Sequence, residues 1–261
     1  MISKNRIKYI VYLQKKKARD EEKLYVVEGD KIVREFLRAG VHISSLVAKP
    51  EFLGSLSAGM LENVKDIEEV SYKELKQIST LKTPHNALAI IDIPERKLDL
   101  SGLKNDLSVA LDFVQDPGNL GTIIRAAGWF GIKNIICSPD CVDVYNPKVV
   151  QSSMGALLHT NVYYSDLEKL FTFAISNKIP VFGTLLEGEP IYSRELERTG
   201  IILLGNESKG ISEGLKQFIT DPLMIPRFSK KGPGIDSLNV GMAASVVFSE
   251  FRRRSFDYKD K

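Results

Sequence analysis

The 261-residue sequence lacks three features that would assign it to a specialised class of protein. It has only two cysteines, too few for the disulfide framework of a small secreted domain, so we expect a cytoplasmic location. No apolar run approaches the roughly 20 residues of a membrane-spanning helix, and the N-terminus lacks the apolar core of a secretory signal. Hydrophobic residues make up 43% and charged residues 26%, which is typical of a folded globular protein and excludes a disordered or fibrous one.

Common nucleotide- and metal-binding motifs are also missing. The chain has neither a G-x-G-x-x-G fingerprint after the first strand of its C-terminal half nor a G-x-x-x-x-G-K-[ST] loop, which argues against a standard dinucleotide or nucleoside-triphosphate site. A G-x-S-x-G nucleophile elbow is absent as well. Its three histidines, His42, His85 and His159, are far apart in sequence, so we expect no metal centre. Cys137 and Cys141 have no second ligand pair nearby and are interpreted as small core residues.

The formal net charge of +3 hides an uneven distribution along the chain. Residues 1–19 contain seven basic residues and no acidic one, so this stretch carries +7 and the remainder carries −4. The seven are Lys4, Arg6, Lys8, Lys15, Lys16, Lys17 and Arg19. The pattern indicates either a binding surface for a polyanion or only the solvated face of a helix.

Strand-like and helix-like patterns alternate along the whole chain, which predicts an α/β fold. A polar stretch that starts at Pro94 and ends at Gly102 is typical of a linker. It predicts a small α/β domain over 1–93, a linker over 94–102 and a larger domain over 103–261. In the larger domain the strand candidates are almost continuously apolar, which favours a mostly parallel sheet covered on both faces.

The expected elements follow from hydrophobic periodicity and from glycine and proline positions. In the smaller domain we expect helices over 4–17, through 33–37 up to Gly40, and over 73–78, and strands over 24–27, 43–48 and 87–93. In the larger domain we expect strands over 107–114, 134–137, 162–164, 181–185, 201–204 and 223–225. The helices between them are expected over 120–130, 149–158, 167–177, 212–218 and 238–253.

Three segments of the larger domain concentrate polar residues where strands end. The first, DFVQDPGNLGTIIRAAGWFG over 112–131, has Asn119 as the expected cap of the following helix. Arg125 is the one charge among apolar residues of that helix and needs an anionic partner or a phosphate. The second, IILLGNESKGIS over 201–212, belongs at the ligand-binding edge of a parallel sheet. The third, LMIPRFSKKGPGIDSLNVGMAA over 223–244, has Ser237 as the expected cap of the last helix.

Taken in this order, the three segments resemble the SpoU (TrmH) family of RNA 2′-O-ribose methyltransferases, within the SPOUT superfamily. The pattern DxVxDPxNxGxxxRxAxxFG is followed by LxGNExxGIS and by IP before SLNVGMAA, and the resemblance covers about 107–253. The N-terminal SKNRIKYIVYLQKKKAR and LYVVEG resemble the small L30e-like substrate-binding domain of many members. The resemblance implies a deep trefoil knot at the C-terminus, S-adenosylmethionine as cofactor, and a homodimer that completes the active site.

The resemblance also implies residue roles. The catalytic set consists of Asn119, Arg125, Glu207, Ser237 and Asn239. The cofactor-binding set consists of Thr184, Gly205, Asn206, Ile225 and Leu238. The RNA-binding set consists of Lys4, Arg6, Lys15, Lys16, Lys17, Arg19, Lys230 and Lys231. Because a guanidinium has no acceptor and a pKa above ~12, we interpret Arg125 as a clamp on a phosphate, and Glu207 as a residue that orients Arg125 or Asn119.

The activity implied is transfer of a methyl group to a ribose 2′-hydroxyl of RNA, with no metal and no membrane partner. Members with this N-terminal domain mostly act on large-subunit (23S-type) ribosomal RNA, so we expect that substrate before transfer RNA. A small-molecule methyltransferase and an RNA-binding or ribosome assembly factor without turnover stay open as alternatives. The segment 230–236 is longer than is usual in the family, and either extends the surface or adds a basic contact to RNA.

Overall fold

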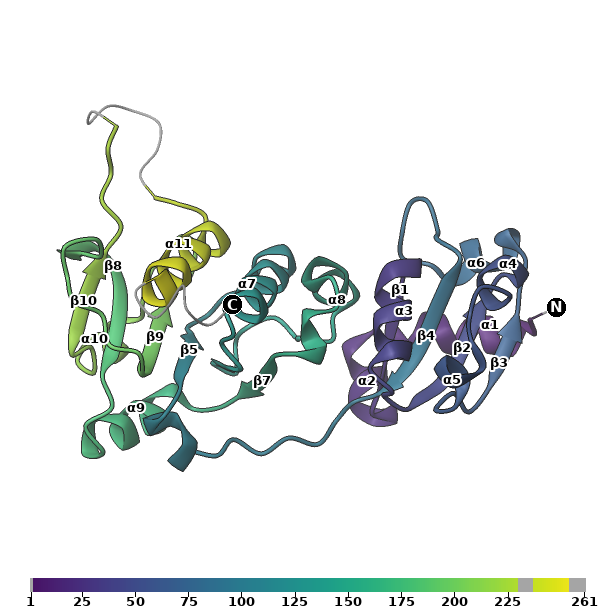
Figure 1. The fold of residues 1–261 in the computed structure, drawn as a ribbon, viewed down its shortest axis with the longest axis horizontal. Helices are drawn as coiled ribbons and strands as arrows, with labels where there is room; N and C mark the ends of the chain where they lie inside the picture. The colour runs from purple at the N-terminus through teal and green to yellow at the C-terminus, as the bar shows by residue number, and fades with distance from the viewer. Residues whose placement is uncertain (1, 230–236, 254–261) are drawn as a thin grey trace. The chain divides into compact units, whose positions relative to one another are not determined.

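Two separate β-sheets organise the chain in the computed structural model, which describes residues 2–229 and 237–253 (Figure 1). The chain divides into two compact units. The first consists of residues 1–95 together with 143–158, and the second of residues 96–142 together with 159–261. The first unit is therefore discontinuous in sequence, and nothing in the sequence pattern indicates this interruption.

The sheet of the first unit has four strands in the order β1-β4-β2-β3. They are β1 (Leu24–Glu28), β2 (Ile43–Ala48), β3 (Ile67–Glu69) and β4 (Ala87–Asp92). Strand β4 lies between β1 and β2 and is antiparallel to both, while β3 pairs with β2 in parallel. The sheet confirms the strands expected over 24–27, 43–48 and 87–93, and the short β3 was not expected.

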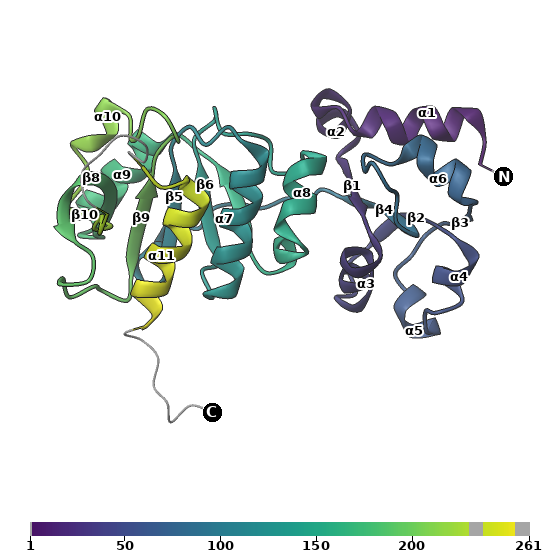
Figure 2. The ribbon, with the colours of Figure 1, turned by 90° about the horizontal axis from the view of Figure 1, so that it is seen from above.

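Helices cover both faces of this sheet (Figure 2). One face carries α1 (Lys4–Leu13), α2 (Lys16–Glu22) and α6 (Tyr72–Ile78), and the other carries α3 (Asp30–Arg38). Two further short helices are α4 (Pro50–Leu53) and α5 (Ala58–Leu61). Ile10 and Leu13 of α1 are fully buried and pack with Leu75 of α6 on the apolar side chains of the sheet. Burial of this kind stabilises short helices more than their intrinsic propensity does.

The single helix predicted over 4–17 is wrong, because the chain breaks at Gln14 and Lys15 and starts again as α2. Arg19 of α2 stabilises the break. Its guanidinium donates to the carbonyl oxygens of Leu13, at 3.1 Å, and of Gln14, at 2.6 Å. These carbonyls lie at the end of α1 and have no partner within the helix, so Arg19 acts as a C-terminal cap from a neighbouring helix.

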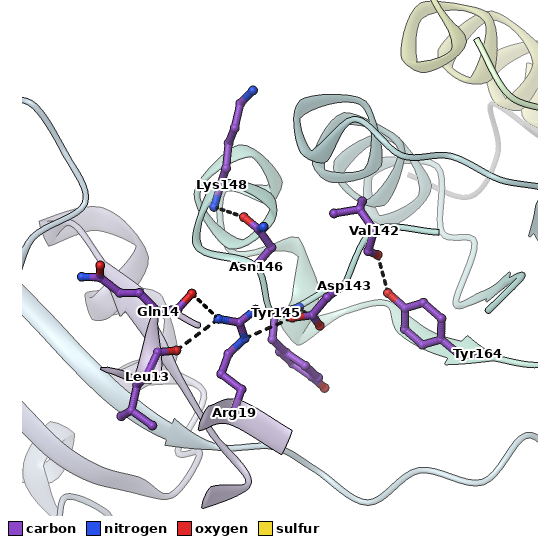
Figure 3. Close-up of polar contacts among 9 residues, drawn as sticks. All are labelled: Leu13, Gln14, Arg19, Val142, Asp143, Tyr145, Asn146, Lys148 and Tyr164. Carbon is purple, nitrogen blue, oxygen red and sulfur yellow. Dashed lines mark hydrogen bonds and ion pairs between the residues drawn. The ribbon is translucent and has the colours of Figure 1, made fainter. Parts of the chain in front are cut away.

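Arg19 is also the centre of a buried ion pair (Figure 3). Its Nε donates to Asp143 Oδ2 at 3.1 Å, and its Nη2 donates to the same oxygen. Asp143 begins the stretch 143–158, which includes α8 (Pro147–Ser153) and the 3₁₀ helix η2 (Ala156–Leu158). Tyr145 packs on Tyr25 of β1 with ring centroids 4.6 Å apart. The ion pair and the ring contact fix this stretch to α2 and β1 of the first unit.

We expect the substitution Asp143→Ala to lower the free energy of unfolding by about 3 kcal/mol, because it leaves a buried guanidinium without its counter-charge. Only 2% of Arg19 is exposed. The matched control is Lys17→Ala, which removes an exposed ion pair with Glu21 and should cost less than about 1 kcal/mol. Urea denaturation followed by circular dichroism measures both values. Equal values for the two variants would show that the Arg19–Asp143 pair does not stabilise the fold.

The sheet of the second unit has six strands, all parallel, in the order β10-β8-β9-β5-β6-β7. They are β5 (Leu107–Leu111), β6 (Asn134–Cys137), β7 (Asn161–Tyr164), β8 (Val181–Pro190), β9 (Gly200–Leu204) and β10 (Asp221–Met224). Strands β5 and β9 are buried along their whole length, as expected of strands covered on both faces. The parallel α/β sheet predicted for the larger domain is confirmed.

Two helical layers cover the six-stranded sheet (Figures 1 and 2). Helices α7 (Pro117–Trp129) and α11 (Val240–Arg253) lie side by side on one face, and α9 (Leu167–Ser176) and α10 (Glu213–Lys216) lie on the other. Phe251 of α11 meets Phe182 of β8 edge to face, with ring centroids 4.9 Å apart. The 3₁₀ helix η1 (Ser101–Lys104) precedes β5. Within the described ranges, no helix is long and apolar enough to cross a membrane.

Two helix starts differ from the prediction. Helix α7 begins at Pro117 with Asp116 as its cap, so Asn119 lies inside the first turn and is not the cap. The side chain of Asn239, and not that of Ser237, accepts the first free N–H groups of α11, from Gly241 at 3.0 Å and Met242 at 3.3 Å. Both shifts place an asparagine side chain beside the carboxyl ends of the strands.

Candidate active site

Three polar segments leave the six-stranded sheet from the same edge. They follow β5, β9 and β10, and all three strands are parallel, so their carboxyl ends face the same way. Ligands of open parallel sheets bind at this edge. The edge therefore gathers three motifs that are spread over residues 112–244 of the sequence.

The loop after β9 is a tight turn that depends on Gly205. The N–H of Asn206 donates to the carbonyl of Gly210, and the N–H of Gly210 donates to the carbonyl of Asn206, both at 2.9 Å. A Cβ on Gly205 would collide with the backbone of Gly210 and Ile211. The Asn206 carboxamide oxygen accepts the N–H groups of the next residues in the turn, so the loop is held by its own backbone and this side chain.

Two side-chain bonds join this loop to the segment that follows β5. Asp112 is buried and accepts the N–H of Ser212 at 2.7 Å. Asn206 Nδ2 donates to the carbonyl oxygen of Phe113 at 2.8 Å. Phe113 has a φ of +60°, which is unusual for a residue with a side chain, and turns its carbonyl toward Asn206. The two loops therefore form one rigid polar edge.

A chain of hydrogen bonds crosses this edge through three side chains. Asn239 Nδ2 donates to Asn119 Oδ1 at 2.8 Å, and Asn119 Nδ2 donates to Glu207 Oε1 at 2.8 Å. Asn206 Nδ2 also donates to Glu207 Oε2 at 3.3 Å. Asn119 and Asn239 each donate one amide hydrogen in this chain, and each Nδ2 carries two. The second hydrogens on Asn119 and Asn239 remain to bind an oxygen of a ligand.

Close packing of α7 on α11 holds the two asparagines in register. A Cβ at Gly241 would lie 3.0 Å from Thr122 Cγ2, so this position accepts only glycine without displacement of a neighbour. Asp116 accepts the N–H of Asn119 at 2.9 Å at the start of α7. Since both helices begin at the same edge of the sheet, their first turns bring Asn119 and Asn239 within hydrogen-bonding distance.

The structure brings together three of the five predicted catalytic residues and not the other two. Arg125 lies six residues beyond Asn119 on α7, which places it about 9 Å farther along the helix axis. Its side chain is exposed and, within the described residues, has no hydrogen bond or ion pair. Ser237 is exposed as well. The interpretation that Glu207 orients Asn119 agrees with the hydrogen bond between them, whereas Glu207 does not contact Arg125.

The predicted cofactor-binding residues lie within β8, directly after β9 and β10, and before α11. Gly205 and Asn206 follow β9, Ile225 follows β10, and Leu238 precedes α11. Thr184 lies in β8 where its pairing with β10 is interrupted, since Pro222 pairs with Gly183 but Leu223 pairs with Glu189. Four of the five residues therefore come from the strands β8, β9 and β10 or from the residues that directly follow them.

The predicted RNA-binding residues differ in their accessibility. Lys4, Lys15 and Lys16 are exposed, and so is Lys17, which pairs with Glu21. Arg6 is half-buried and donates to Glu68 at 2.6 Å. Arg19 is buried in the ion pair with Asp143, so the prediction that it contacts RNA is contradicted by its burial. Lys230 and Lys231 lie outside the described residues, as does the segment 230–236.

Both cysteines lie beneath the loop after β5. Cys137 and Cys141 are buried and free, as expected for core residues. Hydrogen bonds from Cys137 and from the Val114 N–H, the latter at 3.2 Å, lower the pKa of Cys141 to about 7. The hydrogen bond between the two cysteines, together with burial, raises the pKa of Cys137. Among the described residues, no group of three or more histidines, cysteines and carboxylates could hold a metal ion.

Asp112 is the site-forming residue that the sequence-based assignment of roles missed. The sequence does contain a clue to its role, because Asp112 directly follows the buried strand LSVAL, where a buried charge without a partner would be costly. Its partner is the backbone N–H of Ser212, a hundred residues away. Only the fold identifies that partner.

Fold and site together define an α/β ligand-binding domain with its site at the carboxyl ends of neighbouring parallel strands. Residues 106–249 match the SpoU rRNA Methylase family, and the chain belongs to this family. Residues 4–89 match the MRM3-like substrate binding domain.

Similar proteins extend over nearly the whole chain. A TrmH-family protein from Porphyromonas gingivalis has 36% identical residues and a TM-score of 0.86, over 97% of this chain and 99% of that one. The AdoMet-bound rRNA methyltransferase from Sinorhizobium meliloti has 27% identity and a TM-score of 0.85, over 98% of both chains. The 23S rRNA (guanosine(2553)-2′-O)-methyltransferase RlmP of Bacillus subtilis is 26% identical, over 92% of this chain and 93% of that protein.

Proposed function

We propose that this chain transfers a methyl group from S-adenosylmethionine to a ribose 2′-hydroxyl of large-subunit ribosomal RNA. The observation that carries the proposal is the hydrogen-bonded set Asn239–Asn119–Glu207 at the edge of the parallel sheet. Family membership and relatives that act on 23S rRNA support the reaction and the substrate.

The residues at the ends of β8, β9 and β10 fit S-adenosylmethionine. This cofactor carries no phosphate, and the set formed by Thr184, Gly205, Asn206, Ile225 and Leu238 contains no cationic side chain. It offers instead backbone groups for hydrogen bonds and two apolar side chains, of which Leu238 is 46% exposed and free to cover an adenine ring. When bound, the cofactor supplies the electrophilic methyl group.

The chain's own residues position the ribose and stabilise its oxygen. Glu207 fixes the Asn119 carboxamide, and Asn119 in turn fixes that of Asn239. The remaining amide hydrogens bind ribose oxygens and hold the 2′-oxygen in line for transfer. The positive charge of Arg125, placed on the adjacent phosphate, favours the alkoxide as its proton leaves to solvent.

A homodimer brings Arg125 to such a phosphate. Within one chain Arg125 points to solvent on the same face of α7 as Trp129, one turn farther on. Trp129 is 83% exposed and Met242 of α11 is 61% exposed, and apolar side chains on two adjacent helices support a contact with a second copy. We also propose a trefoil knot in the C-terminal segment and a cytoplasmic location, the latter supported by two free thiols.

The direct test maps 2′-O-methylation across ribosomal and transfer RNA in cells with and without the gene. We expect the loss of methylation at one site of large-subunit ribosomal RNA. Loss of a methylated site in transfer RNA would instead identify transfer RNA as the substrate. If no RNA site changes while the purified protein binds S-adenosylmethionine, the chain is an RNA-binding factor without turnover and the proposal fails.

Exposed lysines at the junction of α1 and α2 are expected to contribute to RNA binding. Neutralising Lys15, Lys16 and Lys17 together to glutamine should weaken binding to ribosomal RNA about tenfold or more at low salt and flatten its salt dependence, because fewer counterions are released. The affinity for S-adenosylmethionine should stay unchanged. Filter binding over a salt series, with calorimetry for the cofactor, measures both. An unchanged salt dependence would show that these three lysines do not contact the RNA.

A further inference from the structure

A pocket opens in the first unit, in the sheet face that carries α1, beside the first half of that helix. Its volume is about 190 Å³, smaller than the roughly 300–1,000 Å³ of a site for a whole cofactor. Its lining comes from α1, β1, β2 and β4 of the unit and from the loop before β3. The residues are Arg6, Tyr9, Leu24, Ser44, Ser45, Lys65, Asp66 and Ile90.

A buried serine, Ser45, belongs to the lining of this pocket. It lies on β2, pairs in register with Ile90, and is only 2% exposed. Its hydroxyl has no hydrogen-bond partner among the described residues. A buried hydroxyl that forms no hydrogen bond costs on the order of 1–3 kcal/mol, so most proteins satisfy it. A ligand in the pocket that accepts or donates one hydrogen bond would remove this cost.

The wall of the pocket is partly cationic. The Arg6 guanidinium lies over the ring of Tyr9, 5.6 Å from its centroid, and is held there by its bond to Glu68. Lys65 and Asp66 line the pocket from the two residues that precede β3, and neither side chain has an ion pair within the described part of the chain. Unpaired RNA bases stack on tyrosine rings and guanidinium planes, while lysine binds phosphate.

We propose that this pocket binds one unpaired nucleotide of the RNA substrate. The base stacks on the Arg6 guanidinium, which itself lies over the ring of Tyr9, its edge meets Ser45 and Asp66, and Lys65 binds the adjoining phosphate. Exposed Lys4, on the first turn of the same helix, continues the basic surface beyond the pocket. The inference rests on the proposed function, because it takes RNA to be the substrate.

The substitution Ser45→Ala tests the pocket with little risk to the fold, since it removes an unsatisfied group. We expect Ser45→Ala and Lys65→Gln each to weaken binding of full-length protein to large-subunit ribosomal RNA about five- to tenfold. The thermal midpoint should stay equal or rise for Ser45→Ala. The control is Lys73→Gln, an exposed lysine of α6 outside the pocket, which should bind as the unchanged protein does.

Hydrogen–deuterium exchange of the full chain locates the contact independently of catalysis. Large-subunit ribosomal RNA should slow exchange in peptides that cover 6–10, 43–46 and 64–67. Unchanged exchange there, with Ser45→Ala binding RNA normally, would overturn the pocket proposal even if methylation is demonstrated. Protection by ribosomal proteins but not by RNA would overturn it in favour of protein docking. Loss of RNA affinity in both variants, in a chain that methylates no RNA, would instead sustain the pocket and refute the activity.

Discussion

Replacing Arg125 with lysine is expected to lower the rate of methyl transfer about 100-fold and to leave thermal stability unchanged. Lysine keeps the charge but loses the planar fork that binds a phosphate through two parallel hydrogen bonds. Loss of one preorganised donor at a developing negative charge typically costs this much. Because Arg125 is exposed and has no hydrogen bond or ion pair within the described residues, its replacement should disturb little of the packing. Single-turnover methylation of the mapped RNA measures the rate.

The exposed Arg198→Lys variant is the matched control and should retain the full rate. Near-normal turnover of Arg125→Lys would refute the bidentate clamp. Mixing Arg125→Ala with Asn119→Ala chains tests whether the arginine acts across a dimer. If each site takes Arg125 from one copy and Asn119 from the other, mixed dimers contain one intact site and recover activity. A mixture as inactive as its parents would place both residues in one chain's site or exclude a dimer.

Asn119→Asp is expected to reduce the rate at least 100-fold by removing one hydrogen bond of the central set. The new carboxylate has no hydrogen to donate to Glu207, and two carboxylates at this distance repel each other. The repulsion displaces both side chains from the positions in which they meet the ribose. Since protonation of one carboxylate restores a donor, the loss should become smaller as the pH falls. Rates measured across a pH series test this.

The reciprocal double variant, Asn119→Asp with Glu207→Gln, distinguishes the negative charge of Glu207 from its hydrogen bond to position 119. It places the carboxylate at position 119 and the amide at position 207, so the bond between them forms in the opposite direction, and Asn239 still donates to position 119. We expect recovery of about tenfold over Asn119→Asp alone, which a double-mutant cycle expresses as a coupling. No recovery would mean that Glu207 acts through its negative charge and not by orienting Asn119.

The sequence pattern identified most of the fold because burial leaves a periodic signal. Strands such as LSVAL and GIILL are buried throughout and read as short apolar runs. The short helices α4 and α5 leave no such signal, and the strand β3 is only three residues long. The break between α1 and α2 was missed because it depends on Arg19, whose carbonyl partners lie five and six residues away along the chain.

The candidate site was predicted as a set of residues, but its hydrogen bonds could not be. Spacing places Asn119, Glu207 and Asn239 at the ends of elements, whereas their contacts depend on strand order and on the packing of α7 against α11. The charge count over 1–19 treated Arg19 as part of a binding surface. Its burial shows why a run of basic residues identifies a surface only after the fold has determined which of them are exposed.

The discontinuity of the first unit has a consequence for the order in which the chain can fold during synthesis. Residues 1–95 emerge from the ribosome well before Asp143, which provides the counter-charge for buried Arg19. Until residue 158 has emerged, the N-terminal unit lacks α8 and leaves its guanidinium unpaired. The unit that precedes the sheet in sequence therefore completes its structure only after β5 and β6 of that sheet have been made.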